Sequence, residues 1–172
     1  MENSTSVKSV AYPYGIVLGI YSILALVLIY VFNVAQDNWT VGIINTLVSI
    51  IVFVLAIKKF KQNNSGFLSL KEALKVGLAV AVISGVIGAI YSYIHYSFVY
   101  PEFSEMMYDQ AVLQMTEQGL SEAQQSQGLE MTKMFTSAWF FATMALVGSL
   151  FFGFIISLIT GLILKRENPA HQ

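Results

Sequence analysis

Long uncharged stretches separate the charged residues of this chain. No Asp, Glu, Lys or Arg occurs in 9–36, 38–57, 76–101 or 134–164, and the shortest stretch, 38–57, has 20 residues. An α-helix rises about 1.5 Å per residue, so about 20 residues cross the roughly 30 Å hydrocarbon layer of a membrane. The pattern therefore predicts four membrane spans, at approximately 12–35, 40–58, 74–100 and 136–164.

The composition agrees with membrane spans rather than with a water-soluble core. Hydrophobic residues make up 56% of the chain and charged residues 11%, whereas soluble domains usually have about 25% charged residues. We expect an all-α fold: a four-helix bundle embedded in a membrane, with an extracytoplasmic helical hairpin, residues 101–133, inserted between spans three and four. Residues 1–172 are expected to form a single membrane domain. The first apolar stretch is too long for a cleaved signal segment, so we treat it as a span.

The basic residues are distributed unevenly between the two predicted sides of the membrane. Eight of the nine fall on one side: Lys8, Lys58, Lys59, Lys61, Lys71, Lys75, Lys165 and Arg166. Only Lys133 lies on the other. The positive-inside rule then predicts that both termini are cytoplasmic and that the turn at Asp37 and the insert are outside. Trp39 and Trp139 both fall at the predicted outer boundary, where tryptophan is favoured.

Small residues recur every four positions in two of the spans. They are Ala73, Gly77, Ala81, Gly85 and Ala89 in the third span, and Ala145, Ser149, Gly153, Ser157 and Gly161 in the fourth. Gly15 and Gly19 form a shorter pair in the first span. Small residues let helix backbones approach closely in lipid. We expect spans three and four to pack on each other, with packing on a second copy of the chain, a homo-oligomer, as the alternative.

The predicted cytoplasmic loop ends in a helix start signal. Ser69 followed by Glu72 is a capping box, so the third helix should begin near Leu70. Lys71 and Lys75 would then lie at the level of the lipid headgroups. Lysines at this depth attract anionic lipid by about 1 kcal/mol each, or they only fix the orientation of the protein.

The insert between spans three and four is acidic. Residues 102–133 contain six carboxylates and one lysine, a net charge of −5. Gly119 can end a first helix, at about 102–118, and Ser121 with Gln124 forms a second capping box. We therefore predict a helical hairpin whose second arm, from 122 onward, runs directly into span four.

The insert region also contains five of the seven methionines. Thioethers bind Cu(I), but methionine is also a flexible filler of helix contacts. The segment has no Cys or His to complete a metal site, so we expect neither a metal nor a cofactor. The whole chain lacks cysteine, which excludes disulfides and thiolate metal sites.

Few polar groups occur inside the predicted spans. His95 is the only ionisable group there apart from tyrosines, and it shares a helical face with Ser92, so a polar track between helices is one hypothesis. The alternative is a histidine at the membrane interface, because His95 lies near the outer end of its span. Asn33 and Asn45 could form hydrogen bonds between helices.

These patterns favour a binding or structural role over catalysis. No carboxylate lies in a predicted span, and the chain has no histidine pair, phosphate-binding glycine loop or nucleophile elbow. We expect no enzymatic activity and no nucleic-acid binding. The leading hypothesis is a structural or interaction protein that presents its acidic insert to an extracytoplasmic protein partner. The alternative is a small channel or transporter subunit.

Several landmarks resemble one known family. They are Phe67-Leu68-Ser69-Leu70-Lys71-Glu72-Ala73-Leu74-Lys75-Val76-Gly77, the Tyr100-Pro101 end of span three, the acidic insert, and the segment from Ser157-Leu158-Ile159 to Lys165-Arg166. Together these features are similar to those of the bacterial membrane proteins grouped as domain-of-unknown-function family 4199. The resemblance implies a bacterial four-span protein of the cytoplasmic (inner) membrane. It implies no activity and no site residues.

Overall fold

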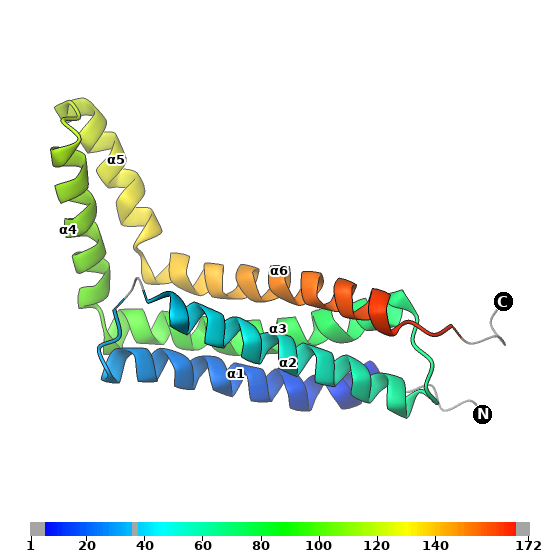
Figure 1. Ribbon diagram of the computed structural model, residues 1–172. Helices are drawn as coiled ribbons and strands as arrows, with labels where there is room; N and C mark the ends of the chain where they lie inside the picture. Colours follow the sequence, from blue (N-terminus) through cyan, green and yellow to red (C-terminus); the bar gives the residue numbers. More distant parts are fainter. Residues whose placement is uncertain (1–5, 36–37, 168–172) are drawn as a thin grey trace. The chain divides into compact units, whose positions relative to one another are not determined.

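The computed structural model describes residues 6–35 and 38–167 (Figure 1). The helices are α1 (Val7–Val31), α2 (Trp39–Asn63), α3 (Leu70–Ile94), α4 (Glu102–Glu117), α5 (Glu122–Phe135) and α6 (Ala138–Leu164), and a π-helix, η1 (His95–Val99), directly follows α3. The described residues contain no strand, only an isolated β-bridge between Leu68 and Arg166. The predicted all-α fold is confirmed.

Four of the helical segments are long and apolar enough to cross a membrane. They are Val7–Val31, Trp39–Asn63, Leu70–Val99 and Ala138–Leu164. The four predicted spans are therefore confirmed in number and approximate position. Several helix ends differ from the predicted limits of the spans, because polar end motifs rather than the limits of the uncharged stretches set them.

The end of α1 shows such a motif. Asn33 adopts a left-handed conformation with φ of 50°. Its N–H donates to the carbonyl of Tyr30 at 3.1 Å, and the N–H of Val34 donates to that of Ile29 at 3.0 Å. These two bonds form a Schellman motif, which ends the helix. Asn33 thus ends α1 at Val31 through its backbone, and a hydrogen bond from its side chain to another helix stays a prediction. Asp37, predicted to close the next turn, lies outside the described residues.

The start of α3 follows its capping box. The N–H of Ser69 donates to Glu72 Oε2 at 2.7 Å, and the N–H of Glu72 donates to Ser69 Oγ at 3.2 Å. Each bond satisfies a backbone donor that the first turn of a helix leaves unpaired. The prediction that α3 begins near Leu70 is confirmed.

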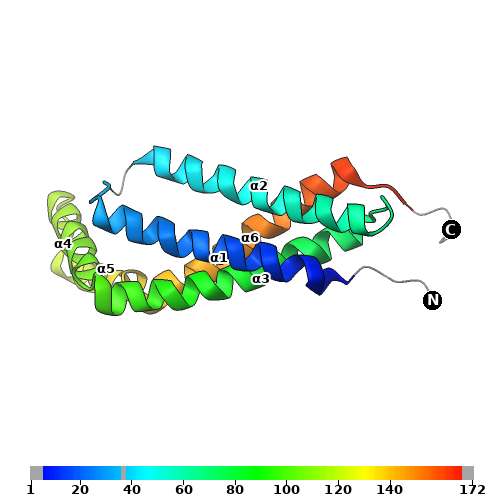
Figure 2. The same ribbon diagram turned by 90° about the horizontal axis from the view of Figure 1, so that it is seen from below.

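The chain forms two compact units, and α3 and α6 each contribute to both. The first unit comprises the described residues up to Gly88 and those from Leu146 onward; the second comprises 89–145. In the first unit, α1, α2 and the included parts of α3 and α6 lie side by side (Figures 1 and 2).

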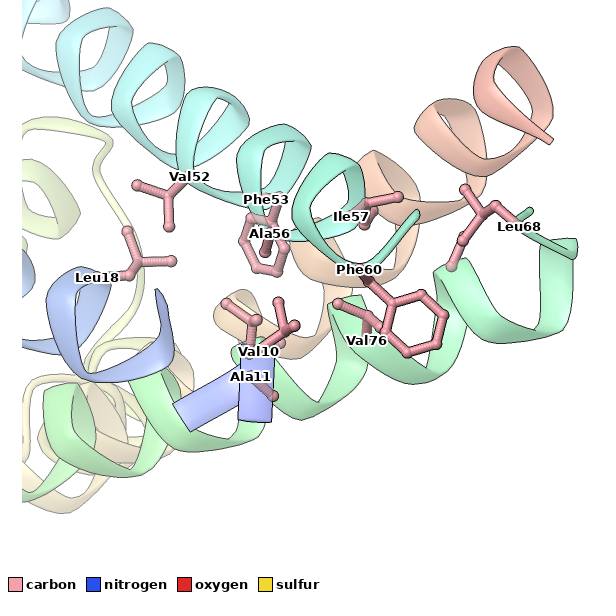
Figure 3. Packing of buried hydrophobic residues seen from close by; sticks show 13 residues of the cluster. Val10, Ala11, Leu18, Val52, Phe53, Ala56, Ile57, Phe60, Leu68 and Val76 are labelled. Atoms are coloured by element: carbon pink, nitrogen blue, oxygen red, sulfur yellow. The ribbon is translucent and has the colours of Figure 1, made fainter. Parts of the chain in front are cut away.

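The core of the first unit lies between these helices (Figure 3). Its buried members are Val10, Ala11, Leu18, Val52, Phe53, Ala56, Ile57, Phe60, Leu68, Ala73, Val76, Val80 and Ala81. The outer faces are apolar as well: Val17 is 56% exposed and Ile163 is 74% exposed. A helix that is apolar on all sides is typical of a membrane span, because lipid covers the face that the protein leaves open.

The second unit contains the predicted helical hairpin, formed by α4 and α5, which pack on each other (Figure 1). Gly119 has φ of 65° and follows the end of α4, as predicted. Ser121 precedes α5, and its N–H donates to Gln124 Oε1 at 3.1 Å. The predicted capping box is therefore confirmed.

The passage from α5 to α6 differs from the prediction. The second arm was expected to continue into span four, but α5 ends at Phe135 and α6 begins at Ala138. Ser137 caps the new helix, since its Oγ accepts from the N–H of Phe140 at 3.2 Å and its carbonyl from that of Phe141 at 3.1 Å. A new N-cap at Ser137 interrupts the helix, and the continuous arm is wrong.

Candidate functional site

The small residues of the first unit lie where helices come closest. A Cβ added at Gly15 would be 2.7 Å from Cβ of Ile83, and one added at Gly19 would be 2.9 Å from Cβ of Ile87. Both separations are shorter than real contacts allow, so α1 could not approach α3 this closely with alanine at either position. The two glycines are buried and face α3.

Glycines also set the approach of α3 and α6. A Cβ at Gly77 would overlap the side chain of Ser157, and one at Gly153 would be 2.6 Å from Cβ of Ala81. Gly161 meets Ala73 in the same way, with a separation of 2.8 Å. The two small-residue stripes therefore face each other within the first unit, and backbones are close along them.

Polar bonds accompany this packing. Ser149 Oγ donates to the carbonyl of Ala81 at 2.9 Å, from α6 to α3, and a Cβ at Gly85 would be 3.0 Å from Cβ of Ser149. Tyr21 Oη donates to Asn45 Oδ1 at 2.6 Å, from α1 to α2. Asn45 thus forms the predicted interhelical bond.

Two stripe residues, Ala89 and Ala145, belong to the second unit, where both are half-buried. Nothing in the structure assigns a neighbouring helix to either of them, so their role in packing stays a prediction.

The predicted polar track includes two buried side chains. Ser92 is 6% exposed and His95 is 1% exposed. His95 opens the π-helix η1, and its carbonyl accepts from the N–H of Tyr100 at 2.7 Å. The bond spans five residues, which widens the backbone turn by one residue. An ionisable side chain is therefore enclosed by protein at a distortion of the third span.

Aromatic rings surround His95. The centroid of its imidazole lies 5.1 Å from the ring of Tyr96, 5.7 Å from that of Tyr91 and 6.4 Å from that of Tyr100. Two of these contacts are edge-on, a favourable aromatic geometry. His95 is therefore packed among aromatic rings inside the second unit.

A second aromatic cluster ties α4 to its neighbours in the second unit. The ring of Tyr96 lies 5.0 Å from that of Phe103 and 4.6 Å from that of Phe141. Phe103 is 5% exposed and is the only buried residue of α4. The sequence analysis missed this cluster; the signal was an aromatic residue two positions after Pro101, where a new helix starts beside a tyrosine-rich span end.

Most of the rest of the hairpin is exposed. No residue of α5 is buried, although α4 packs against it. Leu113 is 63% exposed, and Met131 and Met134 are each 57% exposed. The carboxylates accompany these apolar side chains on the same two helices, so the hairpin presents a surface that is both acidic and apolar.

The hairpin contains one cation, Lys133, which lies over the ring of Tyr108, with Nζ 5.7 Å from the centroid. In residues 6–35 and 38–167, no three His, Cys, Asp or Glu side chains lie close enough together to hold a metal ion.

Four helices of membrane-spanning length and composition define an all-α, multi-pass membrane protein. A sequence model of the family described as "Protein of unknown function (DUF4199)" matches residues 13–166. The match covers most of the chain, which therefore belongs to the DUF4199 family. No curated protein and no solved structure matches the chain significantly.

Proposed function

We propose that this protein is a non-enzymatic interaction protein of the bacterial cytoplasmic membrane, and that its α4–α5 hairpin binds an extracytoplasmic protein with a basic surface. The observation that supports this proposal most strongly is the exposure of the hairpin: α5 has no buried residue, while residues 102–133 have a net charge of −5. A helix pair that served only to connect two spans would need neither its length nor this charge.

The exposed apolar side chains indicate what the partner would meet. Protein interfaces combine apolar anchors with a polar rim, and methionine adapts its shape to different partners. Leu113, Met131 and Met134 provide such anchors on the hairpin. The surrounding carboxylates favour a positively charged partner and would accelerate its association.

The orientation of the hairpin follows from the lysine distribution. Eight of the nine basic residues lie at the start of α1, at the end of α2, at the start of α3 and directly after α6. By the positive-inside rule these parts are cytoplasmic, which leaves the hairpin on the extracytoplasmic side. None of the four predicted spans contains a carboxylate, which supports a role without catalysis.

A channel or transporter subunit is the second candidate, and the buried pair Ser92 and His95 favours it. Ionisable residues within membrane spans are frequently functional, and π-helical segments often occur at functional sites. Reconstituted vesicles should then show a cation flux that falls in His95→Ala. Flux that is absent, or that His95→Ala leaves unchanged, would remove this candidate.

The main proposal can be tested by isolating the protein from its native membrane in mild detergent. We expect a co-purifying protein with a basic exposed surface, which is lost when residues 110–127 are deleted and when Glu105→Gln, Asp109→Asn and Glu117→Gln are combined. High salt should weaken the complex, because exposed charges are screened.

The matched control is Lys58→Gln combined with Lys59→Gln, which changes charge on α2 and should leave the complex intact. If the triple variant, in which residues 102–133 keep a net charge of −2, retains the same proteins as the wild type at every salt concentration, the proposed recognition is wrong. Cysteines introduced at Leu113 and Ser65 test the orientation: an impermeant maleimide should label only the first in intact cells.

A further inference from the structure

Basic residues gather around the loop between α2 and α3 in the first unit. They are Lys58, Lys59, Lys61, Lys71, Lys75, Lys165 and Arg166. We call segments 58–75 and 165–167, which contain them, the basic loop end. Only Glu72 and Glu167 oppose these charges, so the basic loop end has a net charge of +5.

Backbone hydrogen bonds hold the two segments together. The N–H of Leu68 donates to the carbonyl of Arg166, and the N–H of Arg166 donates to that of Leu68, each at 2.8 Å. Leu68 is completely buried. Lys61 Nζ donates to the carbonyl of Leu164 at 2.7 Å, at the end of α6. The remaining cations thus belong to one hydrogen-bonded backbone unit rather than to two segments that move independently.

The carboxylate nearest in sequence to these lysines already accepts hydrogen bonds from other groups. Glu72 accepts from the N–H and Oγ of Ser69, at 2.7 and 2.8 Å, and from Asn64 Nδ2 at 3.3 Å. Five exposed lysines form no ion pair with another described residue: Lys58, Lys59, Lys71, Lys75 and Lys165. The basic loop end therefore concentrates positive charge that the described part of the protein does not neutralise.

We propose that the basic loop end binds the phosphate headgroups of anionic phospholipids. It lies where two membrane-spanning helices, α2 and α6, end and a third, α3, begins, so its side chains are at headgroup depth. Long lysine stems can follow the apolar helix surface while their ammonium groups meet phosphate. This inference is independent of the hairpin and holds for either orientation of the protein.

The contacts described above do not enclose the lysines of the basic loop end in a pocket. Open, exposed charge of this kind favours a lipid over a soluble anion. A lipid is delivered to this depth by its acyl chains, whereas a free phosphate must be held by the protein alone. Lys71 and Lys75 are separated by one helical turn and both are exposed, so one headgroup can lie between them.

The test uses the purified full-length protein in detergent micelles, titrated with phosphatidylglycerol or with phosphatidylcholine of the same acyl chains and measured by native mass spectrometry. Wild type should bind phosphatidylglycerol more tightly. Removing one lysine should weaken this binding roughly fivefold, so Lys71→Gln with Lys75→Gln should weaken it about 25-fold. Affinity for phosphatidylcholine should not change.

Lys133→Gln in α5 is the matched control, because it removes the same charge outside the basic loop end. It should leave the phosphatidylglycerol affinity unchanged. Lys165→Gln is an additional variant, with a loss of roughly fivefold, and circular dichroism checks that each variant is folded.

Three results would overturn the proposal. Equal affinities of the wild type for the two lipids would show no headgroup selection. Equal losses in Lys133→Gln and in Lys165→Gln, each of which removes one positive charge, would show that total charge alone matters. Displacement of phosphatidylglycerol by an equal concentration of inorganic phosphate would identify a free-phosphate site instead.

Discussion

The basic loop end and the α4–α5 hairpin are both charged connections between membrane spans, yet they are attached to the protein in different ways. Each contains a capping box, at Ser69 and at Ser121. In the basic loop end, Leu68 is fully buried and bonded to Arg166. In the hairpin, Phe103 is the single buried residue of α4, and α5 has none.

Because of this difference, the basic loop end contributes to the packed fold, whereas the hairpin leaves most of its surface exposed. The backbone of the basic loop end is part of the first unit, so substitution of its buried residues should lower the stability of the fold. The hairpin is supported by its own α4–α5 contact and by the aromatic cluster around Phe103. Most of its surface contributes little to folding, and is open to a partner.

The largest expected effect comes from leucines in the two regions. Leu68→Ala removes a completely buried side chain and should lower the free energy of unfolding by about 2–5 kcal/mol. Leu113→Ala, at a site that is 63% exposed, should change it by less than about 0.5 kcal/mol. Equilibrium unfolding in mixed detergent micelles measures both. Equal losses would contradict the contrast between the regions.

The substitution of glycine by alanine gives a second comparison, between the first unit and the hairpin. In Gly77→Ala the new Cβ would overlap the buried side chain of Ser157, so we expect a loss of about 1–3 kcal/mol. In Gly128→Ala of the hairpin it would meet the flexible end of Met115, with Cε 2.8 Å away, which can move at a cost below about 1 kcal/mol.

The control for this pair is Gly148→Ala, because no atom outside the neighbouring backbone of α6 lies within 4 Å of its added Cβ. Alanine favours helix over glycine by up to about 1 kcal/mol, so this variant should be no less stable than the wild type. If Gly77→Ala behaved like Gly148→Ala, close approach of α3 and α6 would not be a source of stability.

The smallest expected difference lies between the two capping boxes. Ser69→Ala should cost about 1–2 kcal/mol, since it also releases the half-buried Glu72, whereas Ser121→Ala at an exposed site should cost about 0.5–1 kcal/mol. Hydrogen exchange at the first turns of α3 and α5 would locate each loss. A larger loss at α5 would mean that the hairpin is more tightly coupled to the fold than its exposure indicates.

The sequence was most informative where the physical cause was local. The uncharged stretches predict the spans, because lipid excludes charge, and the Ser69 and Glu72 pair predicts the start of α3, because capping involves neighbouring residues. The stripe residues Gly77 and Gly153 could be recognised as packing positions from their spacing. Their contacts with Ser157 and Ala81 depend on how two distant helices meet.

Other features of the structure were not predicted, because the spacing of residue types along the chain does not indicate them. The sequence did not indicate that Asn33 ends α1; its left-handed backbone conformation shows this. Ser137 lies in the uncharged stretch 134–164 with no Gly or Pro beside it, so the pattern did not indicate a new helix there. The π-helix at His95 is likewise defined by its backbone bonding, which includes the bond from the N–H of Tyr100 to the carbonyl of His95, and not by the spacing of residue types.

The most direct test of the central claim is crosslinking in intact cells from single cysteines, which is feasible because the chain has none. A photoreactive maleimide at Leu113→Cys should form an adduct with another protein that has a basic surface. That adduct should disappear when Glu105, Asp109 and Glu117 are neutralised. The same probe at Val147→Cys, an exposed site on α6, should give no such adduct. The absence of any adduct from Leu113→Cys, or one that survives charge neutralisation, would contradict partner binding by the hairpin.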